Sequence, residues 1–195
     1  MLAWRIGATE PTEVLWGGGK VHAFGFAKDG SRVASVDAES VRIWRPRKAQ
    51  RARFAPSEGN AGNVAFSPDG KLIAFGESQG GVYLVDVEEP ERPVRLGKLA
   101  SYVLDVAFSP DGRRLAAVSN DFVTALYRLN DRTVVKSVRL QGINPAWSDF
   151  PALEYTPDGK LLVVSGPDGR IQALHPETLE LQRDFNRSEA YHSRI

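Results

Sequence analysis

Short apolar runs separated by turn residues follow one another along this chain, and no long segment has a helical period. In the clearest stretch, residues 64–66, 71–76 and 82–87 are predicted strands. The apolar residues of the middle run follow one another without alternating, which is typical of a strand covered on both faces. A more polar fourth strand is predicted over residues 92–96. It contains Pro93, which cannot donate to a ladder, so it is expected at a sheet edge. The pattern predicts a four-stranded antiparallel meander.

This pattern recurs four times, and each copy is marked by an aromatic residue followed three places later by an Asp-Gly pair. The aromatic residues and their glycines are Phe26 with Gly30, Phe66 with Gly70, Phe108 with Gly112, and Tyr155 with Gly159. These glycines lie 40, 42 and 47 residues apart, a spacing typical of propeller blades. We therefore predict an all-β propeller of four-stranded antiparallel blades, with complete blades over residues 18–58, 59–99, 100–141 and 142–187.

Partial repeats flank the four complete ones. Residues 1–17 resemble the third and fourth strands of a blade, and residues 188–195 resemble the approach to another first strand. A blade assembled from these two pieces would lack a second strand, so its first and third strands could not pair. We expect an unfinished ring that another segment or chain completes, because proteins normally cover exposed strand edges. The alternative is a closed five-bladed ring with a thin last blade.

Composition limits the classes of function that the chain can have. It has 25 Lys and Arg against 24 Asp and Glu, so no overall electrostatic field attracts nucleic acid or anionic lipid. It has no cysteine, which excludes disulfides, thiolate nucleophiles and Cys-ligated zinc. No run nears the roughly 18 apolar residues of a membrane span, and the N-terminus lacks the apolar core of a signal peptide. We expect a cytoplasmic protein with no membrane partner.

Residues 66–70 (Phe-Ser-Pro-Asp-Gly), the strand after them, and residues 40–44 (Ser-Val-Arg-Ile-Trp) resemble the WD-repeat (WD-40) propeller family, in its bacterial form. The resemblance covers nearly the whole chain, and TolB-type propellers, whose repeats also read Ser-Pro-Asp-Gly-Lys, are a second choice. No copy keeps the full Trp-Asp pair of the family, and the Gly-His pair is missing. The family's turn Asp, which joins that His in a buried network, is matched only by Asp121 and Asp168, with Ala38 and Gln79 elsewhere. This network is therefore not expected to assemble, and apolar packing between blades must contribute more of the stability.

Several motifs that suggest chemistry have simpler interpretations. Residues 76–80 (Gly-Glu-Ser-Gln-Gly) match a nucleophile elbow, but they join two predicted strands instead of a strand and a helix. The Asp of each Asp-Gly pair is predicted to cap its own turn, because a calcium loop needs several oxygen ligands. The histidines His22, His175 and His192 fall in different copies, and the Gly-rich residues 17–20 lack the residues of a phosphate loop. We predict no catalytic residue, no cofactor and no metal site.

A basic run follows the third strand of the first copy, ahead of a fourth strand predicted at residues 52–55. Its cations are Arg45, Arg47, Lys48, Arg51 and Arg53. Such a run could bind a phosphate backbone or an acidic partner. No aromatic residue interleaves with it to stack bases, so a solvated outer edge is favoured and nucleic acid is not an expected partner.

The longest interval between copies contains residues 142–149, which connect a fourth strand to the next first strand. The family resemblance implies that such connections lie on the face that most often binds partners. Trp147 is a candidate anchor there, because Trp is enriched among binding hot spots. Alternatively, Trp147 folds back over its blade. The residues expected near the same rim are Tyr102, Asn120, Phe122, Asp149 and Phe150.

Together these observations predict a non-catalytic scaffold or sensor module that binds a protein or peptide through loops on one propeller face. If the chain is one piece of a larger protein, the expected setting is the sensor or scaffold propeller of a bacterial signalling or regulatory protein. One alternative is a propeller segment attached to an enzyme whose catalytic domain lies elsewhere. A second is binding of nucleic acid or an acidic partner through the basic run.

Overall fold

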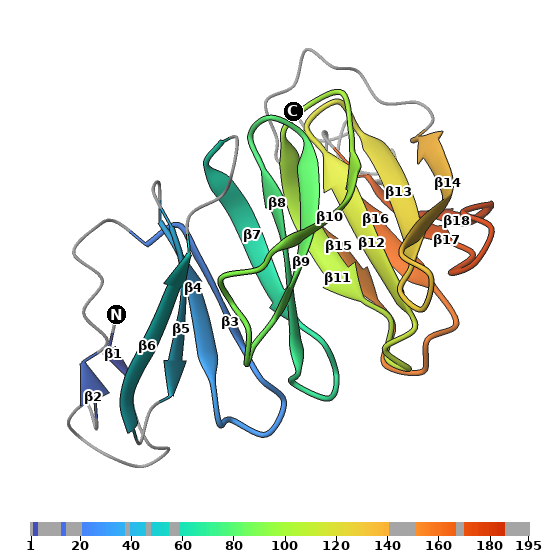
Figure 1. Cartoon of the computed structure of the whole chain (residues 1–195). Coiled ribbons are helices and arrows are strands. Elements are labelled where there is room, and N and C mark those ends of the chain that lie inside the picture. The colour runs from blue at the N-terminus through green and yellow to red at the C-terminus, as the bar shows by residue number, and fades with distance from the viewer. Residues whose placement is uncertain are drawn as a thin grey trace, which may run out of the picture.

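The computed structural model describes residues 2–3, 13–14, 21–37, 40–45, 48–54, 59–140, 151–166 and 170–185. Every regular element within these ranges is a β-strand, and Figure 1 shows the strands gathered into sheets that stand side by side. No helix among the described residues is long and apolar enough to cross a membrane.

Four of the sheets are four-stranded, antiparallel and built from consecutive strands, which confirms the predicted propeller architecture. Blade 1 contains β3 (Ala23–Phe26), β4 (Val33–Val36), β5 (Val41–Arg45) and β6 (Lys48–Phe54). Blade 2 contains β7 (Ala61–Phe66), β8 (Leu72–Glu77), β9 (Gly81–Asp86) and β10 (Val94–Lys98). Blade 3 contains β11 (Val103–Phe108), β12 (Arg114–Ser119), β13 (Val123–Arg128) and β14 (Thr133–Arg139). Blade 4 contains β15 (Leu153–Tyr155), β16 (Leu162–Ser165), β17 (Ile171–Leu174) and β18 (Leu181–Phe185).

A two-stranded sheet precedes blade 1. It pairs β1 (Leu2–Ala3) antiparallel with β2 (Glu13–Val14), as expected for the third and fourth strands of a partial blade. Residues 188–195, the expected start of a further blade, lie outside the described residues. The expected blade boundaries remain predictions.

Strand limits differ from the sequence-based prediction where ladder pairing extends or shortens a run. β6 begins at Lys48, because it pairs with β5 as far back as Arg45, whereas the prediction began at residue 52. β10 begins at Val94, so Pro93 precedes the ladder instead of lying within it. β7 begins at Ala61 and contains an irregularity before Val64, where its register on β8 shifts.

The Asp-Gly turns join the first two strands of each blade. In each turn the glycine has φ between +68° and +70°, and its N–H donates to a carbonyl three residues earlier at 2.8 Å. Asp69 accepts hydrogen bonds from the Ser67 hydroxyl at 2.6 Å and from the Lys71 N–H at 3.1 Å, and Asp111 and Asp158 do the same in their turns. The prediction that each Asp caps its own turn is confirmed. These turns form the lower face in Figure 1, and the opposite ends of the same strands form the upper face.

Apolar packing lies in the seams between neighbouring blades. One cluster combines Val36 and Ile43 of blade 1 with Ile73 and Phe75 of blade 2. Two similar clusters lie between blades 2 and 3 and between blades 3 and 4. Each seam therefore buries side chains that neither sheet could bury alone.

Polar contacts at the second-to-third strand turns differ from the network that the family resemblance implies. Asp121 accepts from the Ser119 hydroxyl at 2.6 Å and from the exposed Arg139 guanidinium at 2.8 Å. In blade 1 the buried Asp37, which sequence matching missed because it lies one position before Ala38, accepts from Ser40 and pairs with Arg42. Asp168 lies outside the described residues.

Candidate partner-binding surface

Two of the predicted rim residues meet on the upper face. Tyr102 lies between β10 and β11, Asn120 lies between β12 and β13, and the Asn120 N–H donates to the Tyr102 carbonyl at 2.7 Å. Asn120 is exposed and Tyr102 is partly buried, and burial raises the pKa of the Tyr102 phenol. The ring lies over Gly62 of blade 2, where an added Cβ would approach Tyr102 Cε2 to 3.1 Å. The absence of a side chain at Gly62 thus makes room for this ring at the seam.

Phe122 does not belong to the exposed part of this rim. Its side chain is 4% exposed and packs in the seam with Leu153 and Leu174 of blade 4. The backbone explains the difference, because Phe122 has φ +62° and its N–H donates to Ser119, which turns the ring inward. Sequence reasoning placed Phe122 at the correct end of the blade but assigned its side chain to the surface.

The remaining rim candidates, Trp147, Asp149 and Phe150, lie outside the described residues. Their positions, and the choice between an exposed and a folded-back Trp147, stay predictions. The described part of the rim is therefore the upper-face site formed by Tyr102 and Asn120.

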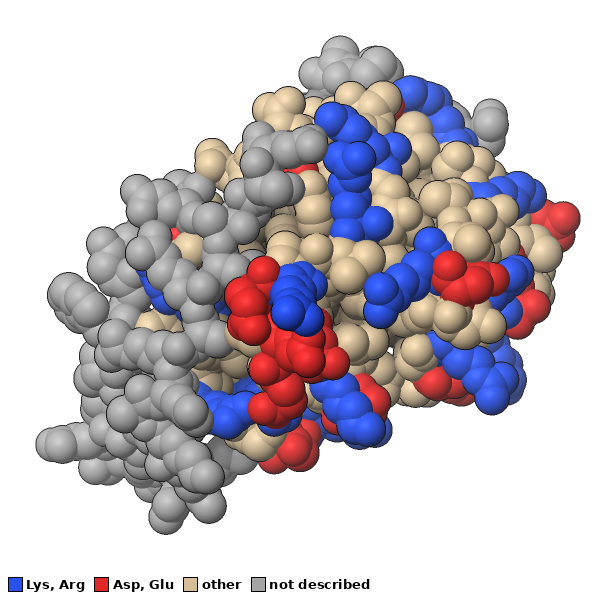
Figure 2. Space-filling view, in the orientation of Figure 1, with Lys and Arg blue, Asp and Glu red and all other residues tan. Residues whose placement is uncertain are grey.

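The basic run is divided between a seam and an outer edge. Arg45 reaches across to blade 2, where its guanidinium binds Glu88 at 2.8 Å, and Arg32 binds the same carboxylate at 2.5 Å. Lys48, Arg51 and Arg53 are residues of β6, the last strand of its sheet, instead of the preceding turn. Arg47 lies outside the described residues. Figure 2 shows cationic and anionic side chains close together on the described part of the face in view. Arg45 thus serves an inter-blade ion pair.

A carboxylate that sequence reasoning missed joins three blades along their first strands. Asp105 on β11 accepts from the side-chain amide of Asn63 on β7 and from the backbone N–H of Leu153 on β15, the latter at 2.9 Å. Burial raises the pKa of Asp105, although these hydrogen bonds act in the opposite direction. Burial also raises the pKa of Glu154, and the nearby Asp105 charge adds to that shift. The sequence signal was a polar residue at the same place in two otherwise apolar first strands.

The elbow-like residues 76–80 cover the end of β8 and the turn that joins it to β9, which confirms the interpretation as a hairpin turn. Ser78 Oγ accepts from the Asn60 N–H at 3.1 Å. Glu77 is fully buried and accepts from the Tyr83 hydroxyl at 3.0 Å, and Gly81 leaves the space that its carboxylate occupies. A serine in a strand-to-strand turn lacks the strand-to-helix setting that an elbow requires.

The described residues contain no group of three or more His, Cys, Asp or Glu side chains placed to hold a metal ion. His175 Nδ1 instead accepts from the N–H groups of Glu177 and Thr178, at 3.2 and 3.3 Å. His22 is exposed at the start of blade 1, and His192 lies outside the described residues.

Comparison with known proteins gives matches to WD repeats. Residues 93–127 match the family described as "WD domain, G-beta repeat". The chain is 28% identical over 156 residues to a Protein LST8 homolog of Drosophila melanogaster, covering 77% of this chain and 50% of that protein. It is 25% identical over 111 residues to WD repeat-containing protein SL1-17 of Schistosoma mansoni, covering 57% of this chain and 35% of that protein.

The chain therefore spans about half the length, or less, of these curated relatives. The matches show similarity to a WD repeat over residues 93–127 and to a WD repeat-containing protein over 57% of the chain. The relatives named here are animal proteins, so they do not confirm the expected bacterial form or the TolB alternative.

Proposed function

We propose, from the WD-repeat character of this chain, that it is a non-catalytic interaction module that binds a protein or peptide partner through its upper face. The observation that carries the proposal is the junction of Tyr102 and Asn120. There two connecting segments are locked together by a backbone hydrogen bond of 2.7 Å, which offers a partner a preorganised surface.

The chemistry of this junction suits peptide recognition. An exposed carboxamide at Asn120 supplies both donors and acceptors, and the neighbouring phenol adds a flat apolar surface with a polar tip. Tyr is among the residues enriched in binding hot spots. Trp147 would extend this surface if it is exposed there.

The proposal is tested by chemical cross-linking and quantitative co-purification of the tagged, full-length protein from its source organism. Asn120→Arg places a long charged side chain on the upper face and should reduce partner recovery by roughly tenfold, because an unpaired charge at an interface is costly. Lys160→Glu changes an exposed charge on the lower face and serves as the matched control. Equal recovery with the Asn120→Arg variant and the wild type would overturn the proposal.

We further propose that additional blades, from another segment or another chain, pack against the two outer sheets. Phe24 and Phe26 of blade 1 are 56% and 58% exposed, and their rings meet edge to face with centroids 5.6 Å apart. On blade 4, Ile171 and Phe185 are 42% and 44% exposed. Large apolar side chains are buried in the seams between the described blades. Their exposure on the two outer sheets therefore supports packing against a further blade of the same architecture.

A further inference from the structure

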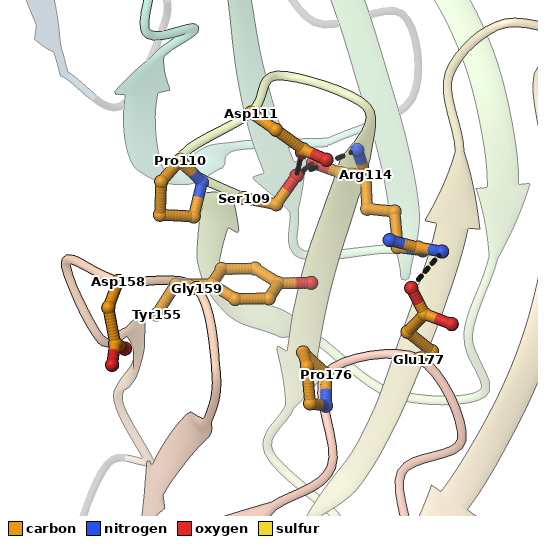
Figure 3. A pocket seen from close by; sticks show the side chains of 9 residues that line it. All are labelled: Ser109, Pro110, Asp111, Arg114, Tyr155, Asp158, Gly159, Pro176 and Glu177. Atoms are coloured by element: carbon orange, nitrogen blue, oxygen red, sulfur yellow. Dashed lines mark hydrogen bonds and ion pairs between the residues drawn. The ribbon is translucent and has the colours of Figure 1, made fainter.

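A pocket opens on the lower face between blades 3 and 4, at the end opposite the Tyr102–Asn120 junction. Its volume is about 370 Å³, which is within the usual range for small-ligand sites. Figure 3 shows Pro110 and Arg114 of blade 3 on one side and Tyr155, Pro176 and Glu177 of blade 4 on the other. The proline rings and the tyrosine ring supply apolar walls.

The Tyr155 hydroxyl is the unusual group in this pocket. The residue is 4% exposed, and Tyr155 Oη has no hydrogen-bond partner. In Figure 3 it points into the space between Arg114 and Pro176. Burial raises the pKa of this phenol, so the hydroxyl stays protonated and keeps both its donor and its acceptor capacity. A buried hydroxyl without a partner is costly to the fold.

Packing does not require this hydroxyl. The corresponding positions of the repeats in blades 2 and 3 are Phe66 and Phe108, which fill their seams with a ring alone. The hydroxyl at Tyr155 is thus an addition to the shared blade pattern, and it lies where a pocket is available to receive a partner group.

The charged groups around the pocket already have partners. Arg114 binds Glu177 at 2.8 Å, and Lys160 binds Asp158 at 3.3 Å. Asp111 accepts from the Ser109 hydroxyl at 2.6 Å. A charged ligand would lose hydration here without gaining an opposite charge of its own, so the lining favours an uncharged ligand.

We propose that this pocket binds an uncharged group that carries a carboxamide or a hydroxyl, held by a hydrogen bond with Tyr155 Oη and by contact with Pro110 and Pro176. The side chains of Arg114 and Glu177 are 25% and 56% exposed, so they can rotate to admit the group. The group could belong to a free small molecule or to a glutamine or asparagine side chain of a peptide. This site is separate from the upper face, and it does not depend on the function proposed above.

The test uses ¹⁵N-labelled full chain and follows backbone amide shifts during titration. N-acetyl-glutamine methylamide should give saturable shifts in the turns around Asp111, Asp158 and Glu177. The matched N-acetyl-leucine and N-acetyl-glutamate methylamides carry the same two backbone amides, and they should bind roughly fivefold more weakly because one lacks the side-chain carboxamide and the other is charged. A glutamine-containing peptide that binds more tightly than the free amide would identify a peptide as the source, and equal binding would identify a small molecule. Either result supports the pocket.

Tyr155→Phe is the decisive variant, because Phe occupies this position in the neighbouring blades. It should weaken binding of the carboxamide roughly fivefold and leave the thermal unfolding midpoint unchanged or raised. Tyr102→Phe, on the opposite face, should leave this titration unchanged. Three results would each overturn the proposal: no saturable binding, binding that Tyr155→Phe leaves intact, or a clear fall in the Tyr155→Phe midpoint. The last would show that the hydroxyl is satisfied by water within the fold.

Discussion

The carboxylate of Asp105 on β11 accepts a 2.9 Å hydrogen bond from the backbone N–H of Leu153 on β15, which ties the first strand of blade 3 to that of blade 4. The same side chain accepts from Asn63 of blade 2. A single partly buried residue therefore links the first strands of three consecutive blades.

Asp105→Ala should lower the free energy of unfolding by about 2 kcal/mol, because it leaves the Leu153 N–H and the Asn63 amide without their acceptor. Asp105→Asn keeps one acceptor and should cost less, since burial already raises the pKa of Asp105 and makes its charge unfavourable. Urea unfolding of the three proteins measures both differences. If Asp105→Ala unfolds at the same urea midpoint as the wild type, these hydrogen bonds make no net contribution to stability.

Gly80 and Gly30 form a matched pair for separating backbone strain from steric overlap. Both have positive φ, at +88° and +68°, but a Cβ at Gly80 would overlap the Leu99 carbonyl, whereas one at Gly30 would meet nothing within 4 Å. Gly30→Ala should cost about 1 kcal/mol from the left-handed backbone alone, and Gly80→Ala should cost clearly more. Thermal and urea unfolding provide the comparison. Equal losses of stability in the two variants would mean that the loop around Leu99 shifts freely to make room for the new methyl group.

The capped turns should make the protein sensitive to acid. The Ser67, Ser109 and Thr156 hydroxyls donate to Asp69, Asp111 and Asp158 and hold the pKa of each carboxyl below its ordinary value of 3.8. Their stabilisation is present above the unfolded-state pKa and is lost as pH falls through the lower folded-state pKa.

Replacing these three aspartates with asparagine should flatten that loss. Asn retains an acceptor oxygen for the turn but does not titrate, so the urea midpoint of the triple variant should fall less than that of the wild type between about pH 6 and about pH 3. The two proteins are compared in the same buffers at matched ionic strength. An identical fall for both would assign the acid sensitivity to other carboxyl groups.

Phe24→Ser combined with Phe26→Ser tests whether the outer face of blade 1 is an association surface. The rings are more than half exposed, so unfolding free energy should change by about 1 kcal/mol or less. Light scattering should show wild-type chain that self-associates with rising concentration and variant chain that stays closer to the monomer mass. Val134→Ser, at a 53% exposed position on β14, is the control and should not alter association. A wild-type monomer that unfolds cooperatively would contradict the proposed packing of additional blades.

Local pattern was sufficient to predict the strands and the Asp-Gly turns, because both depend on residues adjacent in sequence. Contacts across the seams were not predictable in the same way. Phe122 looks like a surface aromatic in a turn until its positive φ directs it inward, and Asp37 and Asp105 look like ordinary polar residues until their partners are placed beside them. The hydroxyl of Tyr155 changes one atom of a repeated aromatic position, and the pocket around it is visible only when two blades are assembled.

The seam clusters have a consequence for how the molecule comes apart. Since each cluster takes its members from two adjacent sheets, stability is a property of couplings between neighbours, as in a one-dimensional chain of interacting units. Blades 2 and 3 have two described couplings, whereas the described contacts of blade 4 lie on the blade 3 side alone. Among the four described blades taken by themselves, opening from the blade 4 side breaks one coupling at a time and should need less free energy than opening in the middle, so the slowest amide exchange is expected in the central pair.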